Sequence, residues 1–175
     1  MEVEQVPIRS LDMTAAILRL PDRRVLVVSV YVLKQDPWAL QSACDNLRKI
    51  IIDTRQNAGT EVDVVIAGDF NRYDQMWGGD NVSLERQGEV DWIIDLIDKF
   101  ALCSLLCWGM KIWHGWDYDT TIDLVLASTD LADTTVKCAI YSIEHGSDHC
   151  TIETVFDTLV LALKQQDRLL LKNAP

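Results

Sequence analysis

The chain has 175 residues, of which 49% are hydrophobic, so it can bury one substantial core, and we expect a single domain over residues 1–175. A formal net charge of −11 argues against a protein that binds a phosphate backbone through a broad basic surface. The sequence has neither the run of about 18 apolar residues that a membrane span needs nor a signal peptide at its start. We therefore expect a soluble intracellular protein, cytoplasmic or nuclear, with no membrane partner.

The cysteines are odd in number and show no C-x-x-C spacing, which indicates neither a disulfide framework nor a zinc site. We expect reduced and mostly buried thiols. They are Cys44, Cys103, Cys107, Cys138 and Cys150.

The first third of the chain predicts a β-hairpin and a long helix. Residues 14–20 and 24–33 are rich in β-branched and aliphatic side chains and flank the turn sequence PDRR. Asp36 and the proline after it then start a helix that runs to about Asn57 and ends at Gly59. The apolar face of this helix consists of Leu40, Ala43, Leu47, Ile50 and Ile51.

Strands and helices continue to alternate along the rest of the chain. A buried strand is expected over residues 63–67, followed by a long polar connection over 71–90 and an amphipathic helix over 91–102. The inward residues of that helix are Ile93, Ile94, Ile97 and Phe100. Three further strands are expected at 122–128, 136–143 and 150–156. This alternation indicates an α/β or α+β fold.

The last residues, 157–173, carry a helical pattern that is partly apolar on both faces. This segment is either a terminal helix packed on the domain or a docking surface for another subunit.

Asp69 and Asn71 follow the buried strand directly. In one interpretation, Gly68 and Asp69 open an ordinary turn. In the other, the strand holds two polar groups at the edge of a sheet, where functional sites are often built.

Tryptophans cluster between residues 107 and 118, and they include Trp113 and Trp116. These rings, together with Trp77, belong either to the core or to an exposed aromatic rim on which a flat substrate stacks.

A third polar motif completes a possible catalytic group. Asp123 opens an apolar strand, so its carboxylate needs a partner, and His149 can provide one. An imidazole held by a carboxylate suits proton transfer near neutral pH. Asp148 would then be available to bind a hard cation.

Four segments, SVYV, AGDFNRYDQMWGGD, TTIDLVLAS and EHGSDH, give the chain a specific resemblance. Over residues 12–156 it resembles the endonuclease/exonuclease/phosphatase superfamily, and especially the endonuclease domains that precede reverse transcriptases in non-LTR retrotransposons, including fungal ones. The resemblance implies a two-sheet β sandwich flanked by helices. It also implies a phosphodiesterase site that uses Mg²⁺ or Mn²⁺ and takes DNA or another phosphodiester.

The resemblance also implies individual roles. Asp123 would pair with His149, Asp69 would activate the attacking water, Asn71 would hold the scissile phosphate, Tyr31 would support the phosphate, and Asp148 would sit at the metal.

The chain departs from the family pattern at two places. The family carries an asparagine and a metal-binding glutamate upstream of the strand that ends here at Tyr31, and Glu2 and Glu4 do not match that glutamate motif. We therefore expect the first strands of the family fold to be lacking. Ile112 stands where the family has a threonine or serine, so a hydroxyl that would touch phosphate is replaced by an aliphatic chain.

Loss of a principal metal ligand weakens cation binding, and missing strands would leave an apolar sheet face open. The C-terminal helix or a second copy in a homodimer could cover that face. Three functions remain: a weak metal-dependent phosphodiesterase, a metal-independent acid/base enzyme that uses Asp123 and His149 on a small hydrophobic molecule, and a non-catalytic dimeric remnant.

Overall fold

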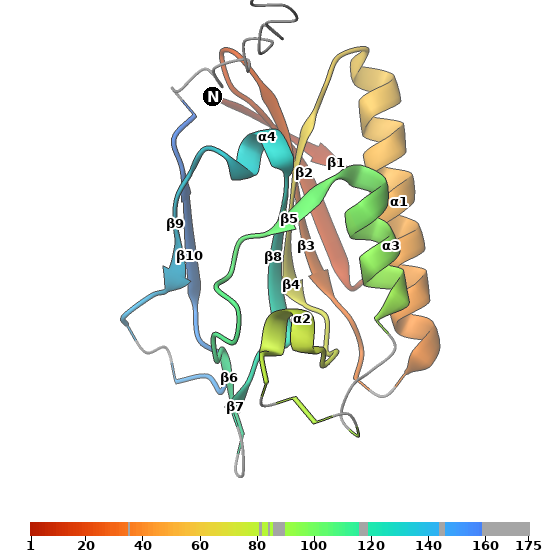
Figure 1. Ribbon diagram of the computed structural model, residues 1–175. Coiled ribbons are helices and arrows are strands. Elements are labelled where there is room, and N and C mark those ends of the chain that lie inside the picture. Colours follow the sequence, from red (N-terminus) through yellow and green to blue (C-terminus); the bar gives the residue numbers. More distant parts are fainter. Residues whose placement is uncertain are drawn as a thin grey trace, which may run out of the picture.

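The computed structural model describes residues 1–34, 36–80, 82–83, 85, 90–115, 119–143 and 146–158. Its centre is a six-stranded mixed sheet with the strand order β1-β2-β3-β4-β8-β5 (Figure 1). The strands of this sheet are β1 Glu2–Val6, β2 Met13–Arg19, β3 Arg24–Tyr31, β4 Asp63–Asp69, β5 Leu102–Ser104 and β8 Asp123–Ser128.

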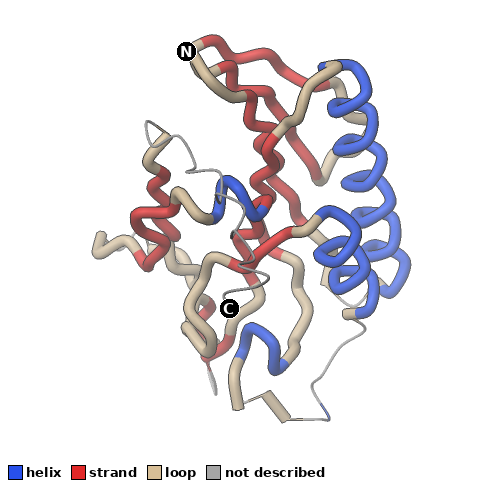
Figure 2. The backbone as a smooth tube through the Cα atoms, turned by 45° about the horizontal axis from the view of Figure 1, so that its top comes forward, coloured by secondary structure: helices blue, strands red, loops and turns tan. Residues whose placement is uncertain are grey.

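The two faces of the main sheet have different partners. Helices α1 (Pro37–Ala58) and α3 (Asp91–Phe100) cover one face, and the hairpin of β9 (Thr135–Ile140) and β10 (Ile152–Phe156) lies on the other (Figures 1 and 2). The expected two-sheet arrangement flanked by helices is therefore confirmed. Small elements complete the described chain, namely α2 Gln75–Gly78, β6 Trp113–His114, β7 Asp119–Thr120 and α4 Thr129–Ala132.

Local signals account for the long helix. The Asp36 side chain accepts a hydrogen bond of 2.9 Å from the backbone N–H of Trp38, and Gly59 adopts φ 61° after the last turn. Asp36 is therefore the N-cap and Gly59 the C-cap of this helix, as the sequence predicts. The apolar face of α1 packs into the larger core, whose members include Leu40, Leu47 and Ile51.

Strand register brings the polar strand ends together. β3 and β4 are parallel, with Tyr31 beside Asp69, and β4 and β8 are antiparallel, with Asp69 beside Asp123. Side chains of paired residues point to the same face of a sheet. Asp69 and Asp123 therefore lie side by side at the end of the face that the β9–β10 hairpin partly covers.

Three local features differ from the sequence-based expectations. The charged start of the chain, for which no strand was predicted, forms an edge strand, β1, which pairs with β2 from Glu2 beside Arg19 to Val6 beside Ala15. Charged side chains are typical of an edge strand because they discourage pairing with other molecules. The polar connection after residue 71 contains the short helix α2, and the expected helix over 91–102 ends at Phe100 because Ala101 is left-handed.

No disulfide joins the five cysteines, all of which lie in the described residues, but the prediction that most are buried was wrong. Cys44 is buried, Cys107 is exposed, and the other three are intermediate. The predicted C-terminal helix falls almost entirely on residues 159–175, outside the described residues. In the described part of the chain, no helix has the length and apolar character to cross a membrane.

Candidate active site

Three side chains from separate parts of the chain meet at one end of the main sheet. Asp69 ends β4, Asp123 begins β8, and His149 precedes β10. The Nδ1 atom of His149 lies 2.8 Å from Oδ2 of Asp123, and possible metal-ligating atoms of all three residues lie within 4.8 Å of one another. An isolated β-bridge between Trp113 and His149 fixes the position of the histidine.

Gly68 allows β4 to deliver Asp69 to this point. Any Cβ atom at residue 68 would lie 1.8 Å from the carbonyl oxygen of Val30 on the neighbouring strand. Only glycine permits this close approach. The Gly-Asp sequence is therefore part of the construction of the site.

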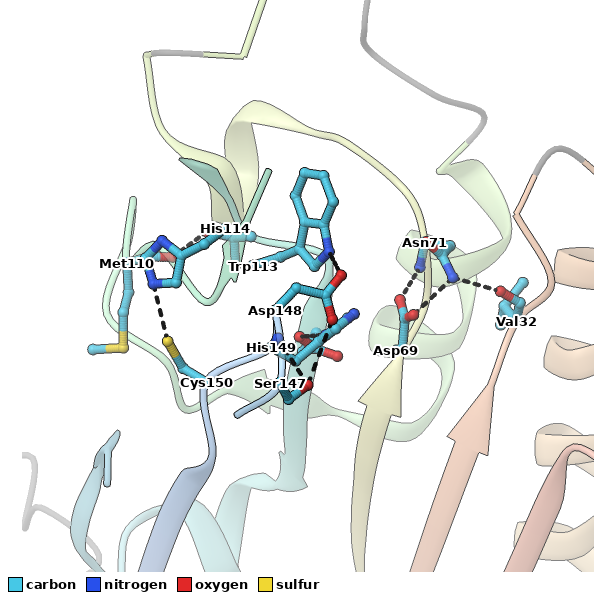
Figure 3. Close-up of polar contacts among 12 residues, drawn as sticks. Val32, Asp69, Asn71, Met110, Trp113, His114, Ser147, Asp148, His149 and Cys150 are labelled. Carbon is cyan, nitrogen blue, oxygen red and sulfur yellow. Dashed lines mark hydrogen bonds and ion pairs between the residues drawn. The ribbon is translucent and has the colours of Figure 1, made fainter. Parts of the chain in front are cut away.

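Asn71 holds Asp69 in place. Its backbone N–H donates to Oδ1 of Asp69 at 2.8 Å, and its amide Nδ2 donates to Oδ2 of Asp69 at 2.7 Å and to the Val32 carbonyl at 3.0 Å (Figure 3). Asn71 adopts φ 49°, which asparagine tolerates better than most residues. The two interpretations of this segment, an ordinary turn and a mount for polar groups, are therefore both correct: the turn itself holds the carboxylate of Asp69 in place.

Burial, together with the smaller effect of the nearby charge of Asp123, raises the pKa of Asp69 to about 6. The hydrogen bonds from Asn71 and the charge of His149 oppose this shift. A carboxylate whose pKa lies near neutrality can both accept and release a proton under ordinary conditions.

Asp148 lies apart from this group. Its Oδ2 accepts a hydrogen bond of 2.9 Å from the indole N–H of Trp113, which holds the pKa of Asp148 below its usual range. The Oγ atom of Ser147 accepts from the backbone N–H of His149 at 3.1 Å. These contacts fix the turn before β10, and Asp148 is absent from the cluster formed by Asp69, Asp123 and His149 among the described residues.

The proposed aromatic residues differ in exposure. Trp77 is only 5% exposed, packs in the larger core and donates its indole N–H to the Arg72 carbonyl at 3.1 Å, so its ring lies in the core and not at an exposed rim. Trp113 is half-buried, and Trp116 lies outside the described residues. Tyr31 is 47% exposed at the end of β3, where it is paired with Asp69 of β4.

One basic residue at the site was missed. The Nζ atom of Lys34 lies 5.4 Å from the centre of the Trp113 ring. This cation–π contact places a positive charge at the rim of an otherwise acidic site. The signal in the sequence was weak, because Lys34 is a single basic residue three positions after the strand.

The residues at the departures from the family pattern do not join the acidic cluster among the described residues. Glu2 and Glu4 belong to the edge strand β1, where Glu4 pairs with Arg19. Ile112 is fully buried in the smaller core, so it has no surface to offer a phosphate.

A cavity of about 470 Å³ opens between the main sheet and β10, with Asp123 and His149 on its wall. Its other walls are mainly aliphatic, including Leu18, Leu20, Val25, Val27, Val65 and Ile152. The apolar sheet face expected to be open is therefore only partly covered by described residues.

Comparison with solved structures identifies similar folds. The endonuclease domain of TRAS1, a telomere-specific non-LTR retrotransposon, gives a TM-score of 0.71 at 16% identity, covering 89% of this chain and 68% of its own. The 3′ phosphatase NExo from Neisseria, solved with a product DNA hairpin, gives 0.58 at 18% identity, covering 89% and 70%. The AP endonuclease LMAP from Leishmania major gives 0.67 at 16% identity, covering 82% and 54%.

No curated protein matches the sequence. A family model described as endonuclease-reverse transcriptase matches residues 25–153, which include β3, β4, β8 and His149. Because this match covers most of the chain, the protein belongs to the endonuclease-reverse transcriptase family, within the endonuclease/exonuclease/phosphatase superfamily.

Proposed function

We propose that this chain is a divalent-metal-dependent phosphodiesterase that nicks DNA. The observation that carries the proposal is the convergence of Asp69, Asp123 and His149 within 4.8 Å at the end of the main sheet. A partly buried carboxylate pair with an imidazole is costly to maintain without a role in binding or proton transfer.

The donor set fits Mg²⁺ or Mn²⁺. Both cations prefer carboxylate oxygens and water, and the carboxylates of Asp69 and Asp123 lie next to each other. Burial is the main cause of the raised pKa of Asp69, and the charge of Asp123 adds to it. These two residues would hold the cation, with Asp148 as a further acidic residue at the rim. When bound, the cation supplies neutralisation of the charge that develops on the phosphate oxygens.

Protein side chains would carry out the proton transfers and hold the reacting groups in position. Asp69, once ionised, takes a proton from the attacking water. Asp123 fixes the tautomer of His149 through Nδ1, so Nε2 is the atom that exchanges a proton with the phosphodiester. Asn71 keeps Asp69 in position because both of its amide hydrogens are directed to Asp69 and Val32.

Substrate contacts would come from the rim. Tyr31 is exposed and paired with Asp69, and the Lys34 ammonium lies over the ring of Trp113. The neighbour from Neisseria was solved with a DNA hairpin, which supports DNA as the substrate. Since the chain carries a net charge of −11, we expect binding to DNA to be weak.

Nicking of supercoiled plasmid with Mg²⁺, Mn²⁺ or EDTA tests the proposal. We expect metal-dependent nicking that falls by about 10³-fold in His149→Ala. Asp130→Asn provides a matched control because this exposed residue lies on α4, away from the cluster. Equal nicking by the wild type and His149→Ala would indicate a contaminating nuclease and reject the proposal, as would no nicking with either metal.

The aliphatic cavity favours a second candidate, a metal-independent acid/base enzyme acting on a small hydrophobic molecule. Asp123 and His149 lie on the wall of this cavity of about 470 Å³, a volume typical of small-molecule sites. A thermal-shift screen of apolar compounds with EDTA present tests this candidate. Binding that raises the melting temperature of the wild type and is weakened by Val65→Trp would support it, and no binding would reject it.

A further inference from the structure

A second polar cluster lies beside the acidic one and involves none of its members. The Sγ atom of Cys150 lies 3.2 Å from Nε2 of His114, and Nδ1 of His114 lies 2.9 Å from Oδ1 of Asp119. Figure 3 shows the contact between Cys150 and His114. The histidine and the aspartate are paired across the β6–β7 ladder, and Cys150 comes from the segment that enters β10.

The order of these contacts fits a proton relay. Asp119 and Cys150 contact opposite nitrogens of the same ring, so the three donors do not surround a common point for a metal ion. The carboxylate favours an N–H at Nδ1, which leaves the lone pair of Nε2 directed to the thiol. Nucleophile, base and orienting carboxylate thus follow one another as in thiol enzymes that transfer acyl groups.

The other cysteines lack these surroundings. Burial raises the pKa of Cys44 to about 12, which makes it inert. Cys103 and Cys138 contact the threonine hydroxyls of Thr129 and Thr154. In the described part of the chain, Cys150 is the cysteine that has an imidazole within contact distance.

Cys150 also lines the aliphatic cavity between the main sheet and β10. An unbranched acyl chain of medium length suits a cavity of about 470 Å³ with aliphatic walls. A carbonyl group at the Cys150 end would keep such a chain within reach of the thiol.

We propose that Cys150, His114 and Asp119 form a nucleophilic thiol site that accepts the acyl group of an apolar ester or thioester. The Cys150 sulfur forms a bond to the carbonyl carbon while its proton passes to Nε2 of His114. The bond from the carbonyl carbon to the leaving oxygen or sulfur then breaks, and the leaving group takes that proton. The products are an S-acyl cysteine and the free alcohol or thiol, with no oxidant or reductant required.

The test uses p-nitrophenyl octanoate and p-nitrophenyl acetate on the full chain. We expect release of one p-nitrophenol per chain, and peptide mapping by mass spectrometry should place the octanoyl group on Cys150. The rate at Cys150 should exceed that at the exposed Cys107 of the same molecules by at least about tenfold. Relative to N-acetylcysteine, the octanoyl ester should be favoured over the acetyl ester.

Three variants separate the relay from simple accessibility. His114→Ala should slow acylation of Cys150 by about 10²-fold, since general bases contribute at least that much, and Asp119→Asn should slow it less. Cys107→Ser should leave the Cys150 rate unchanged. Faster reaction at Cys107, or an unchanged Cys150 rate in a folded His114→Ala protein, would overturn the proposal. Because the comparison between Cys150 and Cys107 is made within the wild type, it holds even if a variant fails to fold.

Discussion

Side chains on the two faces of the main sheet are buried to different extents, and two neighbouring residues of β3 show the difference. Leu26 points to the helices α1 and α3 and is fully buried, whereas Val27 points to the β9–β10 side and is only partly buried. The helix face carries the larger of the two clusters of buried apolar residues, and the other face contains a cavity of about 470 Å³. The helix face thus supplies the rigidity that holds the strands, and the other face supplies the space and the polar groups for chemistry.

Both faces share the backbone of the main sheet, so we expect the largest loss of stability from a substitution that disturbs this backbone. Gly68→Ala would place a Cβ atom 1.8 Å from the Val30 carbonyl oxygen, so β3 and β4 would have to separate. We expect a loss of more than about 3 kcal/mol in the free energy of unfolding, measured by urea denaturation. Gly146→Ala is the matched control, since its φ of 71° carries strain but nothing lies within 4 Å. Equal losses in the two variants would contradict the role of close strand approach.

Truncations on opposite faces of β3 should separate the two kinds of packing. Leu26→Ala should cost about 3 kcal/mol, because it empties space around a fully buried side chain of the larger core. Val27→Ala should cost about 1 kcal/mol or less, because this side chain already borders the cavity. Urea unfolding at one pH measures both. If Val27→Ala cost as much as Leu26→Ala, the cavity face would be as well packed as the helix face.

The pH dependence of stability should report the burial of Asp69. Its pKa in the folded chain, about 6, exceeds that of an unfolded aspartate, so its protonation stabilises the fold. This contribution is complete below about pH 4 and is lost as the pH rises through 6. Since the site is partly solvated, we expect the loss to be on the order of 1 kcal/mol.

Asp69→Asn removes this titration. In EDTA, the stability difference between Asp69→Asn and the wild type should shift in favour of the variant between pH 4 and pH 7, as measured by urea unfolding. Asp130→Asn, on the exposed helix α4, should show no such trend. A difference that stays constant with pH would mean that Asp69 titrates as an exposed carboxyl group.

The elements that could be predicted from the sequence are those specified by residues close to one another in the chain. The runs of β-branched residues in β2, β3 and β4, and the ends of α1 at Asp36 and Gly59, are all specified by neighbouring residues. The edge strand β1 was missed because its charged residues resemble a solvated leader. Elements of two to four residues, such as β6 and α2, are too short for a periodic signal.

The candidate site was only partly accessible from the sequence. Asp69, Asp123 and His149 could be grouped because their motifs resemble those of a known family. No local pattern predicts that the Trp113 indole bonds Asp148, because this contact depends on how two distant turns meet. The pair of His114 and Asp119 had a usable signal, since the two residues flank a short glycine-containing segment that can form a hairpin.

The smallest expected effect concerns the rim of the open face. Trp113→Phe keeps an aromatic ring beside Lys34 but removes the N–H that donates to Asp148 at 2.9 Å. Because Asp148 is fully exposed, we expect nicking to fall only about twofold to fivefold, with no measurable change in unfolding. The pKa of Asp148, followed by carboxyl NMR, should rise toward its ordinary value. A loss of nicking as large as that in His149→Ala, with the pKa of Asp148 unchanged, would show that Trp113 contacts the substrate directly and does not act by positioning Asp148.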